Sequence, residues 1–253
     1  IIVIAANSGG AWSPIGDVTT TMLWIGGQIT SMVIIQSLFL PALVSLLVPL
    51  CVTAWQLRGR TVVSPPQHTT AGVSGTSAFE RNVMFFMGLG VLVLVPAFKA
   101  ATHLPPFLGI TLAHALTQID MASIVFFIGI LLAVATLEHA HILTALAAWL
   151  DQTVQRQDMI VLLIGLVSAV VDNVPLVAAA MGMYSLSVFP TDHFFWEFLA
   201  YCAGTGGSIL IIGSAAGVAA MGMERIHFGW YLKHISGLAL LGYFAGAGVY
   251  ILH

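Results

Sequence analysis

Long apolar runs are the feature that most limits how this chain can fold. The run "SMVIIQSLFLPALVSLLVPLCVTAW" (31–55) reaches the roughly 17 to 25 residues that a helix needs to cross a bilayer. Hydrophobic residues make up 59% of the sequence and charged residues 7%, with a mean hydropathy of +1.01. The runs lack the alternation that transmembrane strands need. We therefore expect an all-α integral membrane protein in contact with lipid.

Two short polar stretches interrupt this apolar background. "NSGGAWSPIGD" (7–17) and "GTGGSILIIGS" (204–214) each bring glycines and small polar residues into an apolar segment. At an offset of 197 residues the first overlies the second without a gap and pairs Ser8 with Thr205, Gly9 with Gly206, Gly10 with Gly207, Ile15 with Ile212, Gly16 with Gly213 and Asp17 with Ser214. We expect two broken helices, with Gly9, Gly10, Gly206 and Gly207 at the breaks.

The order of the expected spans makes the two broken helices antiparallel. Antiparallel pairs of discontinuous helices are typical of secondary transporters built from inverted repeats. This order requires that segment 105–117 crosses the membrane. The expected parts are the end of a first repeat with a broken helix and a span (1–56), a polar linker (57–81), and a second repeat (82–253) that holds spans at 82–101, 105–117 and 121–138, a re-entrant hairpin at about 159–189 and a broken helix at about 194–223.

The expected hairpin has a polar tip, Asp172-Asn173, between apolar arms that are too short for full spans. A single span kinked at Pro175 is the alternative. The internal offset places a matching first hairpin upstream of Ile1. We therefore expect that an N-terminal half of the same protein precedes this chain.

Broken helices free backbone groups inside the membrane, and the chain tolerates this where those groups line a cavity or bind an ion. Backbone carbonyls together with hydroxyl and amide oxygens suit Na+. The candidate oxygen donors near the two breaks are Asn7, Ser8, Ser13, Thr205, Ser208 and Ser214. The alternative for the hydroxyls is helix packing, since Ser and Thr also bond to their own backbone.

Asp17 and Asp172 are the acids that the hydropathy pattern places at membrane depth. An unpaired Asp there costs about 2.5 to 3.5 kcal/mol, so each should have a compensating role. Burial favours a protonated carboxyl and an approaching Na+ favours the ionised one, so one site can exchange a proton for a cation. Each Asp could instead cap a helix N-terminus. Asn173 is a candidate carbonyl ligand or cap at the hairpin tip.

Three motifs resemble the NhaD-type sodium/proton antiporters of the ion transporter superfamily: "NSGGAWSPIGDVTTTMLW", "SAVVDNVPLVAAAMGMY" and "GTGGSILIIGSAAGVAAMGMERIHFGWYLK". The resemblance implies a multi-pass protein of a bacterial inner membrane. It also implies a homodimer that exchanges Na+ or Li+ for H+ without a cofactor.

The leading hypothesis is therefore a Na+ (or Li+)/H+ antiporter, in which cation and proton compete for the aspartates. An anion carrier for dicarboxylates or oxyanions, held at half-helix N-termini, is the alternative. An intramembrane enzyme is disfavoured because the sequence holds neither HExxH nor GxSxG. Seven basic residues and a net charge of -3 give no surface for nucleic acid.

Overall fold

The computed structural model describes residues 1–59, 79, 82–83, 86, 129, 132–137 and 139–253. Most of the expected linker (57–81) and of the spans expected at 82–101, 105–117 and 121–138 lies outside the described residues. The chain divides into two compact units, one formed by Ile1–Thr53 and Asp120–His253 and the other by Ala54–Ile119. The core and the candidate site belong to the first unit.

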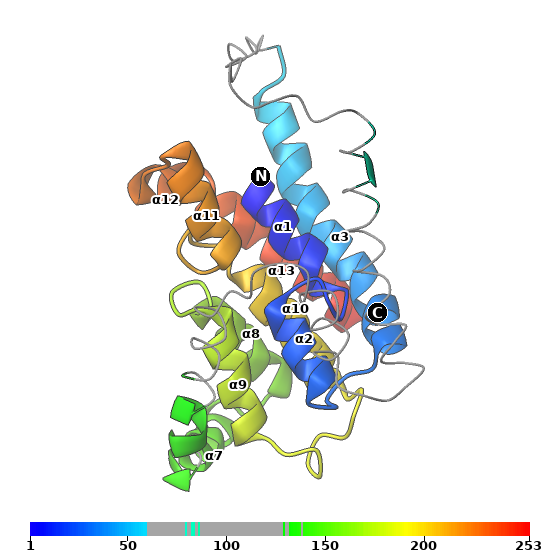
Figure 1. Ribbon diagram of the computed structural model, residues 1–253, viewed down its shortest axis with the longest axis vertical. Coiled ribbons are helices and arrows are strands. Elements are labelled where there is room, and N and C mark those ends of the chain that lie inside the picture. Colours follow the sequence, from blue (N-terminus) through cyan, green and yellow to red (C-terminus); the bar gives the residue numbers. More distant parts are fainter. Residues whose placement is uncertain (60–78, 80–81, 84–85, 87–128, 130–131, 138) are drawn as a thin grey trace. The chain divides into compact units, whose positions relative to one another are not determined.

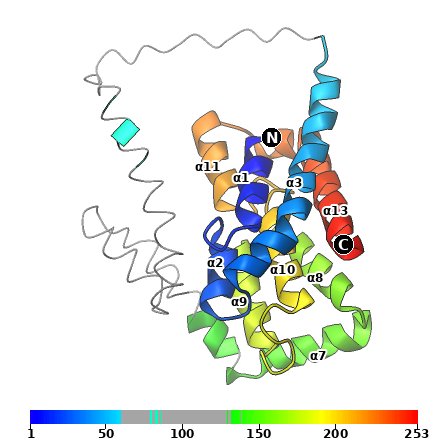
Figure 2. The ribbon, with the colours of Figure 1, turned by 90° about the vertical axis from the view of Figure 1, so that its right-hand side faces the viewer.

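Regular structure in the described part of the chain is helical, as the sequence predicts, and it contains no strand. The helices are α1 (Ile2–Ala11), α2 (Val18–Ile25), α3 (Ser31–Gln56), α7 (Ile142–Val154), α8 (Gln157–Val167), α9 (Asn173–Met183), α10 (Phe194–Gly206), α11 (Ala215–Glu224), α12 (Phe228–His234) and α13 (Ser236–Leu252) (Figures 1 and 2).

Few of the described helices are long enough to span a bilayer alone. By length and composition α3, with 26 residues, is the one that qualifies, and α12 with α13 qualifies if this pair, bent by 52°, forms one span. Several other apolar helices, including α1, α8 and α9, have only 10 to 11 residues. Helices this short cross a membrane only in series or by folding back within it.

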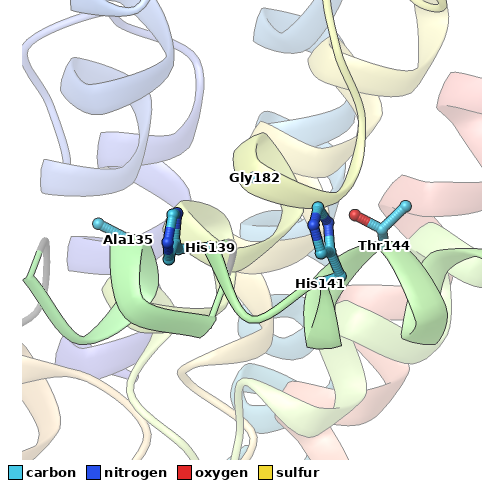
Figure 3. A pocket seen from close by; sticks show the side chains of 5 residues that line it. All are labelled: Ala135, His139, His141, Thr144 and Gly182. Atoms are coloured by element: carbon cyan, nitrogen blue, oxygen red, sulfur yellow. The ribbon is translucent and has the colours of Figure 1, made fainter.

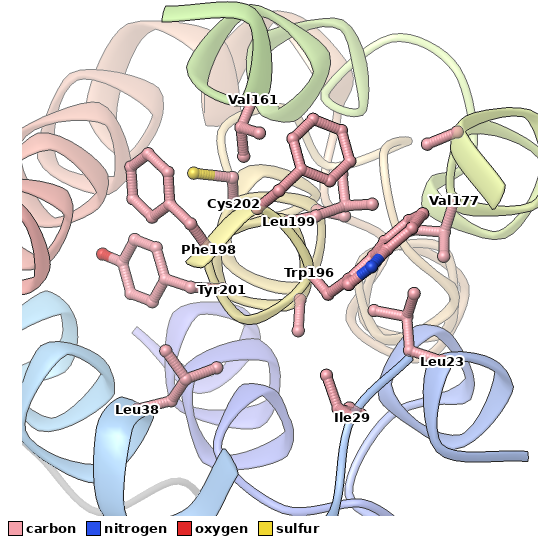
Figure 4. Close-up of a cluster of buried hydrophobic side chains, with 14 of the residues drawn as sticks. Leu23, Ile29, Leu38, Val161, Val177, Trp196, Phe198, Leu199, Tyr201 and Cys202 are labelled. Atoms are coloured by element: carbon pink, nitrogen blue, oxygen red, sulfur yellow. The ribbon is translucent and has the colours of Figure 1, made fainter. Parts of the chain in front are cut away.

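The helix α10 lies at the centre of the core. Every residue from Phe195 to Gly206 is buried, because the helix is mostly apolar and other helices enclose it. It packs against α1, α8, α9 and α13, among others. Figure 4 shows Trp196, Phe198 and Tyr201 extending from α10 toward its neighbours. Truncation of a core aromatic of this kind to Ala costs about 3 to 5 kcal/mol.

Two tyrosine hydroxyls fix α10 between α8 and α13. The Tyr201 hydroxyl donates to the backbone carbonyl of Tyr243 in α13 (2.9 Å), and the Tyr243 hydroxyl donates to the carbonyl of Leu162 in α8 (2.9 Å). Buried hydroxyls that find partners in this way avoid an unsatisfied polar group. The first bond joins α10 to α13, and the second joins α13 to α8, on which α10 also packs.

The chain is interrupted at both places that the sequence predicts. The first interruption separates α1, which ends at Ala11, from α2, which begins at Val18. The second separates α10, which ends at Gly206, from α11, which begins at Ala215.

Both interruptions use the same close approach between two glycines. A Cβ atom added to Gly10 would lie 2.6 Å from the carbonyl oxygen of Gly16, and one added to Gly207 would lie 2.6 Å from that of Gly213. Since Cβ atoms do not approach a carbonyl so closely, only glycine fits at Gly10 and Gly207. Both pairs keep the offset of 197 residues found in the sequence.

Candidate functional site

A cavity of about 370 Å³ lies where three helices begin. Its wall contains the first residues of α2, α9 and α11, and one turn of α1. The lining residues are Ala6, Asn7, Gly16, Asp17, Val18, Asp172, Asn173, Val174, Ser214, Ala215 and Ala216. Five of the predicted site residues therefore meet in one place: Asn7, Asp17, Asp172, Asn173 and Ser214.

Asp17 is the N-cap of α2 and its carboxylate is held by several donors. Its Oδ1 accepts the backbone N–H of Val18 (2.8 Å) and its Oδ2 accepts the hydroxyl of Thr19 (2.5 Å). The Thr20 side chain accepts the backbone N–H of Asp17 (3.3 Å), which completes a capping box. Asp17 thus caps the helix and also faces the cavity, so the two roles predicted as alternatives are compatible.

Two asparagine amides connect the helix starts across the cavity. The Asn173 amide at the start of α9 donates to Oδ2 of Asp17 (3.1 Å). The Asn7 amide in α1 donates to the hydroxyl of Ser214 at the start of α11 (3.0 Å). Both asparagines are buried. The first hydrogen bond joins the tip between α8 and α9 to the first interruption, and the second joins α1 to the end of the second interruption.

Asp172 is the N-cap of α9, but its carboxylate makes no capping hydrogen bond. It is partly exposed, lines the cavity and interacts electrostatically with Asp17. The described residues that line the cavity include no Lys or Arg. Two carboxylates therefore face one cavity without a basic side chain among its described walls, and a cation entering it would relieve their mutual repulsion.

The other four predicted oxygen donors do not line this cavity. The Thr205 hydroxyl in α10 donates to the carbonyl of Tyr201 (2.6 Å), and the Ser208 hydroxyl, just past the end of α10, donates to that of Thr205 (2.6 Å). Ser8 accepts the hydroxyl of Ser45 in α3 (2.8 Å), and Ser13 accepts the N–H of Ile15 (3.4 Å). These hydroxyls are engaged in local backbone bonding and helix packing.

The four glycines predicted at the breaks have different surroundings. Gly10 and Gly207 form the close approaches described above. A Cβ on Gly206 would overlap the carbonyl oxygen of Gly165, so this glycine lets α10 pack on α8. Around Gly9 a Cβ would meet nothing within 4 Å. The second member of each close pair, Gly16 or Gly213, was aligned in the sequence but was not assigned to a break.

Sequence reasoning also missed Thr19 and Ser45. Thr19 is fully buried and orients the Asp17 carboxylate, and its signal was the "TTT" run that begins two residues after Asp17. Ser45 is buried in α3 between Pro41 and Pro49 and supports Ser8. Nothing in the sequence distinguishes Ser45 from the other serines of apolar helices.

A second, more open cavity of about 520 Å³ is lined by Ala135, His139, His141, Thr144 and Gly182 (Figure 3). It has no carboxylate among its described lining residues. Within the described residues, no group of three or more His, Cys, Asp or Glu side chains is placed to hold a metal ion. The cavity at the three helix starts is therefore the stronger candidate for a cation site.

Comparison with known proteins gives two kinds of match. Residues 1–204 match the CitMHS family, described as citrate transporter. Sodium/proton antiporter 1 of Arabidopsis thaliana is 48% identical over 275 residues, covering 99% of this chain and 47% of that protein. Sodium/proton antiporter 2 of the same plant is 45% identical, covering 99% and 66%. The Na(+)/H(+) antiporter NhaD of Vibrio cholerae is 30% identical, covering 99% and 60%. No solved structure matches the chain.

The predicted resemblance to NhaD-type antiporters is confirmed by these matches. The relatives carry the names of transporters, not of enzymes, and come from a plant as well as from bacteria. The chain spans about half to two thirds of the length of the relatives named above. Since the family match covers residues 1–204 of 253, the chain belongs to the citrate transporter family of membrane transport proteins.

Proposed function

We propose that the protein containing this chain exchanges Na+ or Li+ for H+ across a membrane, at the cavity between Asp17 and Asp172. The observation that carries this proposal is the meeting of two carboxylates, two amides and a hydroxyl in one cavity. Such hard oxygen groups suit an alkali cation, whereas a thiol or imidazole set would suit a transition metal. The names of the relatives, sodium/proton antiporters, point to the same exchange.

The exchange follows from competition for the carboxylates. With the cavity empty, Asp17 and Asp172 repel each other, and a proton or a sodium ion removes that repulsion. Binding of one lowers the affinity for the other. The Asn173 amide donates an N–H to Oδ2 of Asp17, so a cation that binds this oxygen displaces the amide. A rotated amide then offers its carbonyl oxygen as a ligand.

Alternating access would follow from the arrangement of the broken helices. We assign α1–α2 and α10–α11 to the two halves of an inverted repeat, and α8–α9 to a re-entrant hairpin whose tip is Asp172-Asn173. The matching glycine pairs and the short arms support this assignment. A homodimer and the bacterial inner membrane stay predictions, and the plant relatives leave the kind of membrane to be determined.

An anion carrier is the second candidate function, favoured by the family description and by three helix N-termini at the cavity. The two aspartates argue against it, because they occupy two of these three N-termini and would repel a carboxylate substrate. Among the described lining residues there is no basic side chain to bind one. A cation exchanger therefore explains more of the residues in this site than an anion carrier does.

The test uses acidified inverted vesicles that carry the full-length protein and a pH-sensitive dye. NaCl or LiCl should dissipate the pH gradient, whereas choline chloride should not. The Asp172→Asn variant should insert normally and lose the response. The exposed Ser187→Ala serves as the control, because its hydroxyl contacts only the neighbouring Ser185. Uptake of a dicarboxylate without any response to Na+ or Li+ would overturn the proposal in favour of the anion carrier.

A further inference from the structure

We propose that Ser214 sets the valence of the cation, because it is the uncharged member of three N-cap residues that face one cavity. This inference rests on the proposed function and specifies its ligand as a single monovalent cation. The caps are Asp17 on α2, Asp172 on α9 and Ser214 on α11. All three residues line the cavity.

Ser214 and Asp17 hold equivalent positions in their helices. Asp17 has φ -140° and ψ 154°, and Ser214 has φ -151° and ψ 154°. Each side chain accepts a backbone N–H of its own helix, from Val18 (2.8 Å) or from Gly217 (3.3 Å). The gapless internal alignment pairs the same two residues. The second interruption therefore has a hydroxyl where the first has a carboxylate.

Asp17 and Ser214 each also accept a hydrogen bond from an asparagine amide of another helix. Asn173 donates to Asp17, and Asn7 donates to Ser214. A carboxylate at position 214 would find the same two kinds of donor that hold Asp17, namely a helix N–H group and an amide. The site is thus built to accept a third acid, and the sequence has serine there instead.

The charge balance shows what this serine does. A helix N-terminus carries roughly half a positive charge, so the three termini together contribute roughly +1.5. Against the two ionised aspartates this leaves roughly -0.5, which one monovalent cation reverses to roughly +0.5. A divalent cation would leave roughly +1.5, an excess of positive charge that disfavours its binding. A third carboxylate would lower each of these values by one unit and bring the divalent complex to roughly +0.5.

Charge, not shape, must therefore distinguish the variants. Ser214→Asp adds a carboxylate, whereas Ser214→Asn adds a neutral side chain of nearly the same size. Both Asp and Asn are good N-caps, so helix capping alone would not separate them. Ser214→Asn is accordingly the matched control.

The experiment measures Na+-dependent dissipation of the pH gradient in vesicles that carry the full-length protein, with and without CaCl2. In the wild type, Ca2+ should neither dissipate the gradient nor inhibit the response to Na+ at equal concentration. In Ser214→Asp the Ca2+ concentration for half-inhibition should fall by roughly tenfold or more, since carboxylate count tunes Ca2+ affinity. Ser214→Asn should behave like the wild type toward Ca2+.

Ca2+ exchange by the wild type would overturn the inference, and so would equal Ca2+ sensitivity of the Asp and Asn variants. If a variant fails to insert, the wild-type measurement still tests whether the site takes a single monovalent cation. A wild type that ignores both Na+ and Li+ would instead remove the proposed function. The two failures are therefore distinguishable.

Discussion

The two interrupted helices share a backbone design but differ in the residue that faces the cavity. Both have a Gly–Gly close approach at the end of one helix and start the next helix with an extended N-cap residue. The first cap is Asp17, with Thr19 bonded to its carboxylate, and the second is Ser214. The backbone design explains why the chain can break inside an apolar core, whereas the caps decide what the break can bind.

The largest expected effect separates the two caps. Asp17→Asn should lower the apparent affinity for Na+ by on the order of 100-fold, because it removes a charge from the cavity. Ser214→Ala should lower it by less than about tenfold, because only a neutral oxygen is lost. The Na+ concentration for half-maximal exchange in vesicles measures both. Equal losses of Na+ affinity in the two variants would show that both caps contribute alike to cation binding, and would contradict the difference between the two interruptions.

The shared backbone design predicts that the two glycine positions respond alike. Gly10→Ala and Gly207→Ala should each destabilise the protein by about 1 to 3 kcal/mol, because the added Cβ would lie 2.6 Å from a backbone oxygen. Thermal unfolding in detergent micelles checks this. Gly9→Ala is the control, since its Cβ meets nothing within 4 Å. Destabilisation at only one of the two positions would contradict a common design.

A smaller effect is expected at Thr19, which has Ala216 as its counterpart in the second interruption. Thr19→Val keeps the shape but removes the hydroxyl that orients Asp17, and should raise the half-saturating Na+ concentration by roughly tenfold. Thr53→Val provides the control, because that hydroxyl bonds to its own helix at Pro49. If both variants match the wild type, Asp17 does not need this donor.

The smallest effect is expected for the hydroxyls at the end of α10. Ser208→Ala should cost about 0.5 to 1.5 kcal/mol of stability, the usual net value of one hydrogen bond, and leave the half-saturating Na+ concentration unchanged. Micelle unfolding and vesicle titration test the two parts. A loss of Na+ affinity as large as that of Thr19→Val would mean that the ion reaches Ser208, as the sequence suggested.

Hydropathy and the internal offset were sufficient to predict the helical class and both interruptions, and they identified Asp17 and Asp172 as candidate site residues. Their placement at helix starts was only the alternative considered for them. These features depend on local composition, which the sequence displays directly. The same offset aligned Gly16 with Gly213, although their role in the close approaches became clear only from three-dimensional distances. A pattern of small residues identifies a break but not the pair of atoms that closes it.

The direction of each hydroxyl was beyond what the sequence could predict. Thr205 and Thr19 both lie in or beside the interrupted stretches, yet Thr205 bonds to its own helix and Thr19 bonds to a carboxylate at the cavity. Side-chain rotamers and the packing of neighbouring helices decide between these outcomes. Ser45 acts through a contact with Ser8 across two helices, which no local pattern indicates.

Binding of radioactive sodium to the purified full-length protein, measured at several pH values, tests most directly whether the two aspartates form one cation site. Saturable binding should occur in the wild type, weaken as the pH falls because protons compete for the carboxylates, and be weakened by on the order of 100-fold or more in both Asp17→Asn and Asp172→Asn. Unchanged sodium binding in either variant, or sodium binding that does not depend on pH, would contradict the proposed site.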